Sequence, residues 1–600
     1  MSLKINFNIY ILLVSGFSLV TFNSCKEKPV EDIGIPVEEL IKGLNPEKLS
    51  DLILQKSKDT LYKPKGIYDS RFGDTLKKFY IERDGKPVWL SFLKDSIVRR
   101  HLKEVLLSTE EHGLQAKFYN GQLIMKHLVT FDSMKIIKSD KEYHFLSDLD
   151  YLISMSIISI YKDLAIGRID PHKFYKPFFE MQLTRAQSFN IFGVLQRPRF
   201  FQDSITLKRP WSVRYHQLQV LYKKYNDYLK NNKILDFDTA QSVSSDHNIK
   251  VVDQRMEIIW LSQTDSVKQT KLHMFANRDK YIKKTRTLFG LPPGDIDSVF
   301  IETICGSVYD IVDNALVSME RERWFSKPDT GIYVYANLTE FMVYLHSDSL
   351  KQMRVCVGKS KALNYDERYR DYLKTKNARA KPINSETPVI GSRIREVVIN
   401  PTWTVPNSII GKEMYHQIVA NPNYLTRKGY EVVKDGKVVP PGSINWKKFK
   451  PYGVTVKIRQ KAGDGNSLGK LKFNFPNGHN IYMHDTPEKG KFNQTNRAVS
   501  HGCVRLNKPL EMAEFLLKLQ GDSSLVDKFR IKMGLQPYDT ALQMADSLLK
   551  PIKNTENIKL KNTVAVYIDY KTIALQKDGS FIFYRDIYRK YKAGAKKLKE

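Results

Sequence analysis

The hydrophobic pattern of this chain changes abruptly after Pro328. Before that residue, apolar side chains recur every three or four positions, as in 96–107 and 149–164, which is typical of amphipathic helices. After it, apolar and polar residues alternate, as in 331–336 and 352–358, which is typical of consecutive antiparallel strands. We therefore predict a multidomain α+β protein with helical units first and a mainly β domain afterwards.

The chain of 600 residues is too long for a single hydrophobic core, so several domains are expected. We predict a helical scaffold at 46–249, a small helical unit at 250–306 and a mainly β domain at 328–520. A C-terminal extension at 521–600 would have a structural role. In that extension we expect a hairpin formed by residues 564–570 and 581–584, around Asp578 and Gly579.

Two long segments interrupt the alternating pattern of the β domain. Residues 361–380 are highly charged and are expected to form a solvated loop or a short helix. Residues 407–451 contain several aromatic residues, among them Tyr415, Tyr424 and Trp446. Long segments inside compact domains are often lids, so we predict a structured lid at 407–451.

The N-terminus has the pattern of an export signal. An apolar run at 9–20 follows a short polar start and precedes Ser24-Cys25, which predicts a signal peptide at 1–24. The small residue before Cys25 resembles a bacterial lipobox and implies cleavage and lipidation there; ordinary cleavage nearby is the alternative. Residues 25–45 would be a tether. We expect a lipoprotein of the periplasm or cell envelope, anchored to a membrane.

The net charge of +31 has two readings: a lysine-rich solvated surface, or attraction to an anionic partner. Export argues against nucleic acid as that partner. No zinc finger, RNA-binding aromatic motif or glycine-rich phosphate loop accompanies the charge. We expect no nucleic-acid partner, and we favour a solvated surface over attraction to an anionic wall or membrane.

The strongest chemical signal is the string Ser500-His501-Gly502-Cys503-Val504-Arg505. The thiolate is the reactive form of cysteine, so a catalytic cysteine needs a nearby base or imidazolium. His484 ends a short apolar and aromatic run that reads as a strand, and it is the candidate partner of Cys503. Either residue alone could be structural, but their combination with the glycine and the arginine favours catalysis.

Two other cysteines, Cys305 and Cys356, follow the expected leader. If Cys503 stays free to react, both are most simply buried apolar residues, and a disulfide between them is the alternative. We expect neither a cofactor nor a metal ion, because no second close cysteine or tight histidine pair completes a tetrahedral zinc site. The conceivable zinc ligands are His484, Asp485, His501 and Cys503.

These residues resemble the active-site signature of the YkuD-type L,D-transpeptidase catalytic domain. Further segments are similar to the large, scaffold-bearing (YcbB-like) branch of that family: 400–406, 475–477 and 482–487. Residues 161–171 resemble the scaffold domain of that branch, and 281–304 resemble, more weakly, the end of a peptidoglycan-binding repeat. The resemblance implies a helical scaffold, a peptidoglycan-binding-like unit at 250–306 and a mainly β L,D-transpeptidase domain with a lid insertion.

The resemblance also implies peptidoglycan biosynthesis, with roles in cell wall organization and cell shape and with carbapenems as inhibitors. Cys503 would form an acyl-enzyme on a tetrapeptide donor stem and release D-Ala. A second stem peptide would accept the acyl group, giving a 3-3 cross-link. The alternatives are an L,D-carboxypeptidase or hydrolase of wall-linked peptides, and a non-catalytic wall-binding scaffold.

The family match assigns roles to individual residues. His484 would be the base, oriented by the backbone carbonyl of Asp485. The N–H groups of Gly502 and Cys503 would hold the oxyanion, in a loop shaped by Ser500 and His501. The expected substrate-binding residues are Asn400, Trp403, Tyr482 and Arg505.

Overall fold

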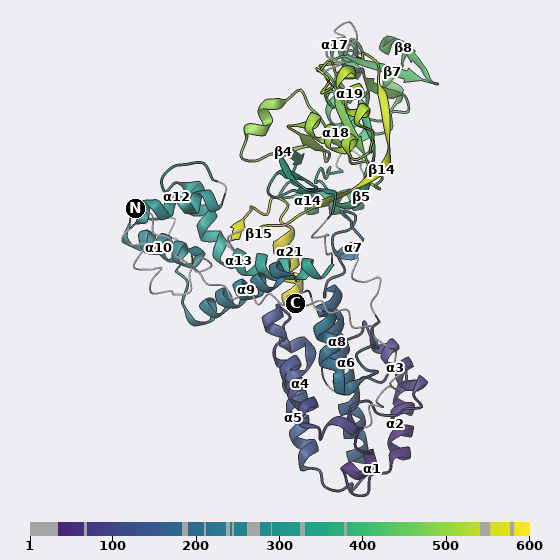
Figure 1. The fold of residues 1–600 in the computed structure, drawn as a ribbon, viewed down its shortest axis with the longest axis vertical. Helices are drawn as coiled ribbons and strands as arrows, with labels where there is room; N and C mark the ends of the chain where they lie inside the picture. The colour runs from purple at the N-terminus through teal and green to yellow at the C-terminus, as the bar shows by residue number, and fades with distance from the viewer. Residues whose placement is uncertain are drawn as a thin grey trace.

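The computed structural model describes residues 34–600, with gaps at 65, 67–68, 183–189, 209, 211, 236–239, 243–244, 261–276, 290, 325–330, 377–380, 540–551 and 576–580. The leader expected at 1–24 and the lipidation site expected at Cys25 lie outside the described residues. Helices dominate the N-terminal half and strands the C-terminal half (Figure 1). The predicted multidomain α+β class is therefore confirmed. Within the described ranges, no helix is long and apolar enough to span a bilayer.

The N-terminal helices form one layer around a central buried helix, α6 (Asp140–Ile166). A capping box at its start joins the Ser139 side chain to Glu142, satisfying N–H groups that a helix leaves unpaired. The helix ends at Gly167, whose φ of +87° favours glycine. Around α6 pack α2 (Pro46–Lys58), α3 (Gly73–Glu82), α4 (Ser96–Leu107), α5 (Gly121–Ser133) and α8 (Phe201–Lys208).

A second helical group projects sideways from the first (Figure 1). Its helices share one core with a short hairpin from the far end of the chain. The group consists of α9 (Val213–Asn231), α10 (Asp246–Trp260), α12 (Arg278–Leu288) and α13 (Ser298–Trp324). Thus α9, which lies inside the segment predicted as scaffold, packs with helices of the 250–306 unit. The helix α13 continues without a break beyond residue 306, to Trp324.

The C-terminal half contains a large sheet of ten strands. Along the chain, β2 (Tyr333–Asn337), β3 (Met342–His346) and β4 (Leu350–Gly358) form the expected antiparallel meander. On the far side of β4, the sheet continues through β13 (Val504–Leu506), β11 (Met483–His484), β10 (Leu471–Asn474) and β5 (Val389–Ile399). The two short strands β1 (Phe179–Glu180) and β12 (Ala498–Ser500) pair with β5 and β4.

One strand from the C-terminal extension completes this sheet. β14 (Glu556–Asp569) pairs in parallel with β2 and antiparallel with β5, so it joins the two ends of the strand path. The predicted pairing of 564–570 with 581–584 is therefore wrong, because 564–569 are occupied by the main sheet. The extension does contain a hairpin, formed by β15 (Ile573–Leu575) and β16 (Phe581–Phe583). Asp578 and Gly579, expected at the turn, lie outside the described residues.

The segment predicted as a lid, 407–451, lies within a slightly longer folded subdomain, 403–460, which has its own apolar core. Its four-stranded sheet runs β6 (Trp403–Thr404), β9 (Lys457–Gln460), β7 (Tyr430–Lys434) and β8 (Lys437–Val439). Short helices cover it, including α16 (Tyr415–Ala420) and α17 (Asn423–Arg427). In the other interruption, at 361–380, an exposed helix α14 (Tyr365–Thr375) forms.

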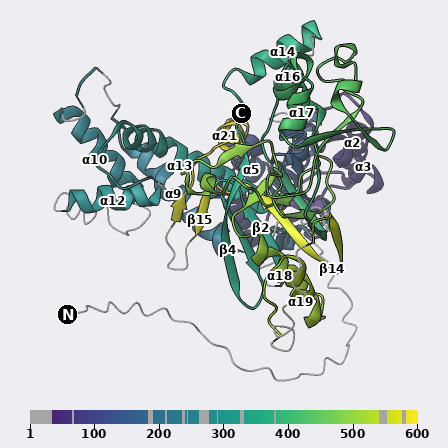
Figure 2. The same ribbon diagram turned by 90° about the horizontal axis from the view of Figure 1, so that it is seen from above.

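The C-terminal helix α21 (Lys590–Lys599) lies against α13, and both views show it at the centre of the molecule, where helical and sheet parts meet (Figure 2). Its apolar side chains Tyr591, Ala595 and Leu598 enter the core of the large sheet. The C-terminal extension thus holds the helical units and the sheet together.

Candidate active site

Two adjacent strands bring Cys503 and His484 to one face of the sheet. β11 and β13 pair in parallel, with Met483 opposite Val504 and His484 opposite Arg505. Met483 and Val504 are buried in the core. Because side chains alternate along strands, Cys503, His484 and Arg505 share the opposite face. The structure therefore places the predicted nucleophile and base one diagonal step apart on neighbouring strands.

The loop before Cys503 is held by hydroxyl groups. Ser500 Oγ donates to the Cys503 carbonyl at 2.7 Å and accepts from the Gly502 N–H at 3.1 Å. Thr387 Oγ1 donates to the Gly502 carbonyl at 2.7 Å, and Gly502 has a φ of +127°. The Gly502 N–H, predicted as an oxyanion donor, is thus occupied by Ser500 in this structure, because the loop is closed on itself. Thr387 lies more than 100 residues before Gly502 in the sequence, and no motif around it indicated that it would contact this loop.

His484 is buried and fixed in one tautomer. Its Nδ1 donates to the carbonyl of Asp485, the acceptor expected from the family match, so its Nε2 is left as the basic nitrogen. The Asp485 carboxylate accepts from the N–H of Lys470 at 2.9 Å and is paired with Lys489. Burial, with added repulsion from Arg505 and Lys472, lowers the pKa of His484 to about 3. The imidazole is therefore neutral at physiological pH.

The Cys503 thiol is also neutral. Burial raises its pKa, and hydrogen bonds from Tyr482 with the positive charges of Lys472 and Arg505 oppose that rise only in part. Desolvation disfavours the charged form of any acid. The site therefore holds a neutral thiol and a neutral imidazole rather than a preformed thiolate–imidazolium pair.

This protonation state predicts how Cys503 responds to alkylating reagents. Only the thiolate reacts, and the raised pKa of Cys503 keeps the thiolate fraction small. The rate at which iodoacetamide labels Cys503 should increase about tenfold per pH unit from pH 6 to 8.5. Mass spectrometry of the peptide that contains Cys503 measures this rate. A plateau below pH 7 would show a stable thiolate–imidazolium pair instead.

Tyr482 links the thiol to three other groups, Trp403, His484 and Lys472. Its hydroxyl is hydrogen-bonded to Cys503 and to Trp403, and its ring lies 5.6 Å from the His484 ring. Lys472 Nζ lies 4.1 Å from the centroid of the Tyr482 ring, and Lys472 is paired with His484 across β10 and β11. The structure thus brings Trp403 and Tyr482 to the site. It adds Lys472, which strand alternation in 470–473 could have placed there.

Two other predicted substrate-binding residues have structural partners. Arg505 Nη1 lies 2.5 Å from Glu488 Oε2. In this structure the guanidinium therefore forms an ion pair with a loop carboxylate of the protein itself. Asn400 points toward the C-terminal segment: its side chain donates to the Ile552 carbonyl, and its own carbonyl accepts from Thr555 at 2.7 Å. Asn400 therefore fastens the end of β5 to that segment. Its backbone has a φ of +45° at this point.

The lid touches the catalytic loop directly. His501 Nε2 lies 2.7 Å from Glu413 Oε1, and Glu413 sits in a π-helical turn, Ile410–Met414. A charge-assisted contact of this kind is stronger than a neutral hydrogen bond. Sequence reasoning missed Glu413, because the fold alone brings it to His501. The predicted loop residue His501 thus connects the nucleophile loop with the lid.

If the contact between Glu413 and His501 holds the lid in place, its removal should let reagents reach the Cys503 thiol faster. Glu413→Ala should loosen the lid and increase the rate at which a bulky maleimide labels Cys503 severalfold. The matched control is Lys412→Ala, which removes an exposed neighbour and should leave the rate unchanged. Equal rates for both variants would show that the contact does not hold the lid.

A cavity of about 640 Å³ lies beside Tyr482. It is lined by charges of both signs, including Glu396, Lys472 and Arg395. The carbonyl of Asn480, another lining residue, is 4.0 Å from Cys503 Sγ. The cavity therefore lies next to a residue that contacts the thiol, and it offers partners for both carboxylate and ammonium groups.

Of the other cysteines, only Cys356 has a side chain that the structure describes. Cys356 is a free, buried residue of β4, as expected, and the side chain of Cys305 lies outside the described residues. Among the described residues, no group of three or more histidine, cysteine, aspartate and glutamate side chains could hold a metal ion.

Comparison with known proteins agrees with this geometry. Residues 331–531 match the family model of the L,D-transpeptidase catalytic domain (YkuD), and residues 74–220 match that of the scaffold domain. A Haemophilus influenzae protein named "Putative L,D-transpeptidase" is 36% identical over 212 residues, which are 34% of this chain and 37% of that protein. The chain thus matches little more than a third of the length of this relative. Both resemblances drawn from the motifs are confirmed.

Proposed function

We propose that this chain, which contains a YkuD-type L,D-transpeptidase catalytic domain and a scaffold domain, cross-links peptidoglycan through an acyl-enzyme on Cys503. The observation that carries the proposal is the shared sheet face of Cys503 and neutral His484; a cavity with charges of both signs lies beside the neighbouring Tyr482. A neutral imidazole beside a thiol is suited to activate it as a nucleophile.

In the proposed reaction, His484 Nε2 takes the thiol proton as Cys503 Sγ attacks the carbonyl carbon of the third residue of a tetrapeptide stem. The bond to the terminal D-Ala breaks, and the proton on His484 passes to the leaving amine. The amine of a second stem then attacks the thioester, which releases the thiol and forms a 3-3 cross-link. The N–H of Cys503 is the proposed oxyanion donor, since Ser500 occupies that of Gly502.

The cavity next to Tyr482 supports a charged stem peptide as the donor. Glu396 and Asn474 lie side by side there, joined by a hydrogen bond of 2.7 Å, and Lys472 and Arg395 supply positive charge. A stem residue with both an ammonium and a carboxylate would find partners in this one cavity. We further propose that the protein acts in the periplasm, with Cys25 lipidated and a membrane as its anchor.

Purified protein incubated with tetrapeptide muropeptides tests the proposal. Dimers with 3-3 links, identified by mass spectrometry together with free D-Ala, are the expected products. Free D-Ala with tripeptide monomers alone would show that water is the acceptor, and the protein would then be an L,D-carboxypeptidase. No release of D-Ala would contradict both enzymatic readings and leave the wall-binding scaffold.

A further inference from the structure

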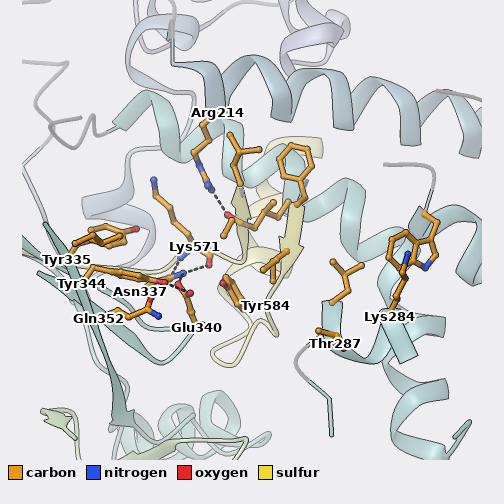
Figure 3. Close-up of a pocket in the computed structure, with 18 of the residues that line it drawn as sticks. Arg214, Lys284, Thr287, Tyr335, Asn337, Glu340, Tyr344, Gln352, Lys571 and Tyr584 are labelled. Carbon is orange, nitrogen blue, oxygen red and sulfur yellow. Dashed lines mark hydrogen bonds between the residues drawn. The ribbon is translucent and has the colours of Figure 1, made fainter. Parts of the chain in front are cut away.

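The chain beyond β14 passes two parts of the large sheet. Its hairpin of β15 and β16 lines a cavity of about 1100 Å³ (Figure 3), and neither Cys503 nor His484 belongs to the wall of that cavity. Residues 586–591 then run beside the end of β4, where Ser360 Oγ donates to the Ile587 carbonyl at 2.6 Å. Both parts follow residue 531, where the match to the catalytic family model ends. They are therefore additions to the matched domain.

Tyr588, in the second of these parts, bridges two backbone segments of the catalytic domain. Its hydroxyl donates to the Gly358 carbonyl at 2.7 Å and accepts from the Thr387 N–H at 3.2 Å. Its own N–H donates to the Tyr570 hydroxyl at 2.7 Å, and the two rings are stacked with their centroids 5.3 Å apart. Both tyrosines are buried. The position of the Tyr588 hydroxyl is therefore fixed by its surroundings.

Thr387 connects Tyr588 with the loop that carries the nucleophile, 500–503. The Thr387 hydroxyl accepts from the Gly358 N–H at 2.8 Å and donates to the Gly502 carbonyl at 2.7 Å. Gly358 is also the strand partner of Ser500, at the start of the loop. Thr387 is fully buried, so water does not replace these bonds. Tyr588 and Thr387 thus bind both polar backbone groups of Gly358 and hold the loop from one side.

The Gly502 carbonyl belongs to the same peptide unit as the Cys503 N–H. That unit is planar and trans, so its C=O and its N–H point in opposite directions. The hydrogen bond that fixes the Gly502 carbonyl on Thr387 therefore also fixes the direction of the Cys503 N–H. Without this bond the unit could rotate, because Gly502 has a φ of +127° and glycine adopts other backbone conformations at little cost.

We propose that Thr387 and Tyr588 are positioning residues that orient the Cys503 N–H toward the oxyanion formed during attack by the thiol. The inference rests on the proposed function, in which this N–H is the oxyanion donor. Such a donor lowers the barrier because it is aligned before the charge develops, and removal of one donor slows other enzymes by about 10²–10³-fold. The C-terminal segment then acts on the chemistry of the site, although neither residue touches the reacting atoms.

Two reagents separate the orientation of this donor from the packing of the loop. p-Nitrophenyl acetate acylates Cys503 through an oxyanion: the thiol gives its proton to His484, Sγ bonds to the ester carbonyl carbon, and p-nitrophenolate leaves. Iodoacetamide alkylates the same sulfur by direct displacement of iodide, with no oxyanion. Both reactions consume the thiolate, so the ratio of their rates does not depend on the thiol pKa. Mass spectrometry of the peptide that contains Cys503 measures both rates, and no peptidoglycan is needed.

Hydroxyl deletions test each positioning residue. Thr387→Val removes the hydroxyl at nearly constant volume and should lower the ratio of acylation to alkylation about 10²-fold, whereas Thr387→Ser keeps the hydroxyl and should restore the ratio. Tyr588→Phe should lower it about tenfold, because Thr387 keeps its own bond to Gly502. The matched control is Tyr591→Phe, which removes a buried hydroxyl of the same segment that donates to the Tyr570 carbonyl at 3.3 Å. This control should leave the ratio unchanged.

The inference is supported if acylation slows in Thr387→Val and Tyr588→Phe while alkylation proceeds as in the unaltered protein. Equal losses in both rates, equal ratios in Tyr588→Phe and Tyr591→Phe, or no acylation of Cys503 in the unaltered protein would overturn it. With muropeptides, the same variants should lower kcat and leave KM unchanged, since the donor acts in the transition state. Failure of the unaltered protein to release D-Ala would contradict the proposed function alone, because the two reagents test the positioning separately.

Discussion

A Cys503→Ala protein is expected to lose D-Ala release and cross-linking by at least about 10⁴-fold, because removal of a covalent nucleophile leaves only substrate binding and oxyanion contacts. The same variant should form no covalent adduct with a carbapenem, whereas the unaltered protein should gain the mass of one inhibitor on the peptide containing Cys503. Intact-protein mass spectrometry measures the adduct, and chromatography of muropeptides measures the products.

The matched control is Cys356→Ala. Cys356 is the other described free cysteine, buried in β4 and paired with Arg505 on the neighbouring strand. Its loss removes a thiol near the site without removing the nucleophile, so adduct formation should persist. An adduct that survives in Cys503→Ala, or one that disappears in Cys356→Ala, would contradict the assignment of the nucleophile.

A His484→Ala protein is expected to be about 10²–10⁴-fold slower at low substrate, the usual contribution of a general base. The pKa of His484 is lowered to about 3, so the basic form is present throughout pH 5 to 8. The unaltered protein should therefore keep its activity down to pH 5 without a loss from this group. The variant should instead accelerate about tenfold per pH unit, because hydroxide must then ionise the thiol.

The control for this experiment is His416→Ala, an exposed histidine of the lid, which should leave the pH profile unchanged. An acid limb near pH 6.5 in the unaltered protein would contradict the neutral, buried state of His484. An unchanged rate in His484→Ala would show that another group takes the proton.

Local signals were enough to predict much of the fold. The helices α4 and α6 follow from the apolar periodicity of 96–107 and 149–164. The meander of β2 to β4 follows from alternation over a short stretch. In each case the backbone hydrogen bonds that form the element join residues near each other in the sequence, so the local pattern is enough to predict the element.

Contacts between distant segments could not be predicted. Thr387 reaches the carbonyl of Gly502 and Glu413 reaches His501, and no pattern around Thr387 or Glu413 distinguishes them from surface residues. The partners of Asn400, a residue expected to bind substrate, likewise come from a distant segment, 552–555. Tertiary packing decides these cases, and a single sequence does not report it.

The position of β14 has a consequence for biosynthesis. The strand that joins β2 to β5 is made after every residue of the catalytic site, and it lies beyond the matched segment 331–531. Until it arrives, β2 and β5 present open edges, which are prone to pair with other chains. The nascent polypeptide therefore cannot finish its catalytic sheet before its last segment is synthesised. A recombinant fragment cut at residue 531 would keep the reactive cysteine but would be prone to aggregate.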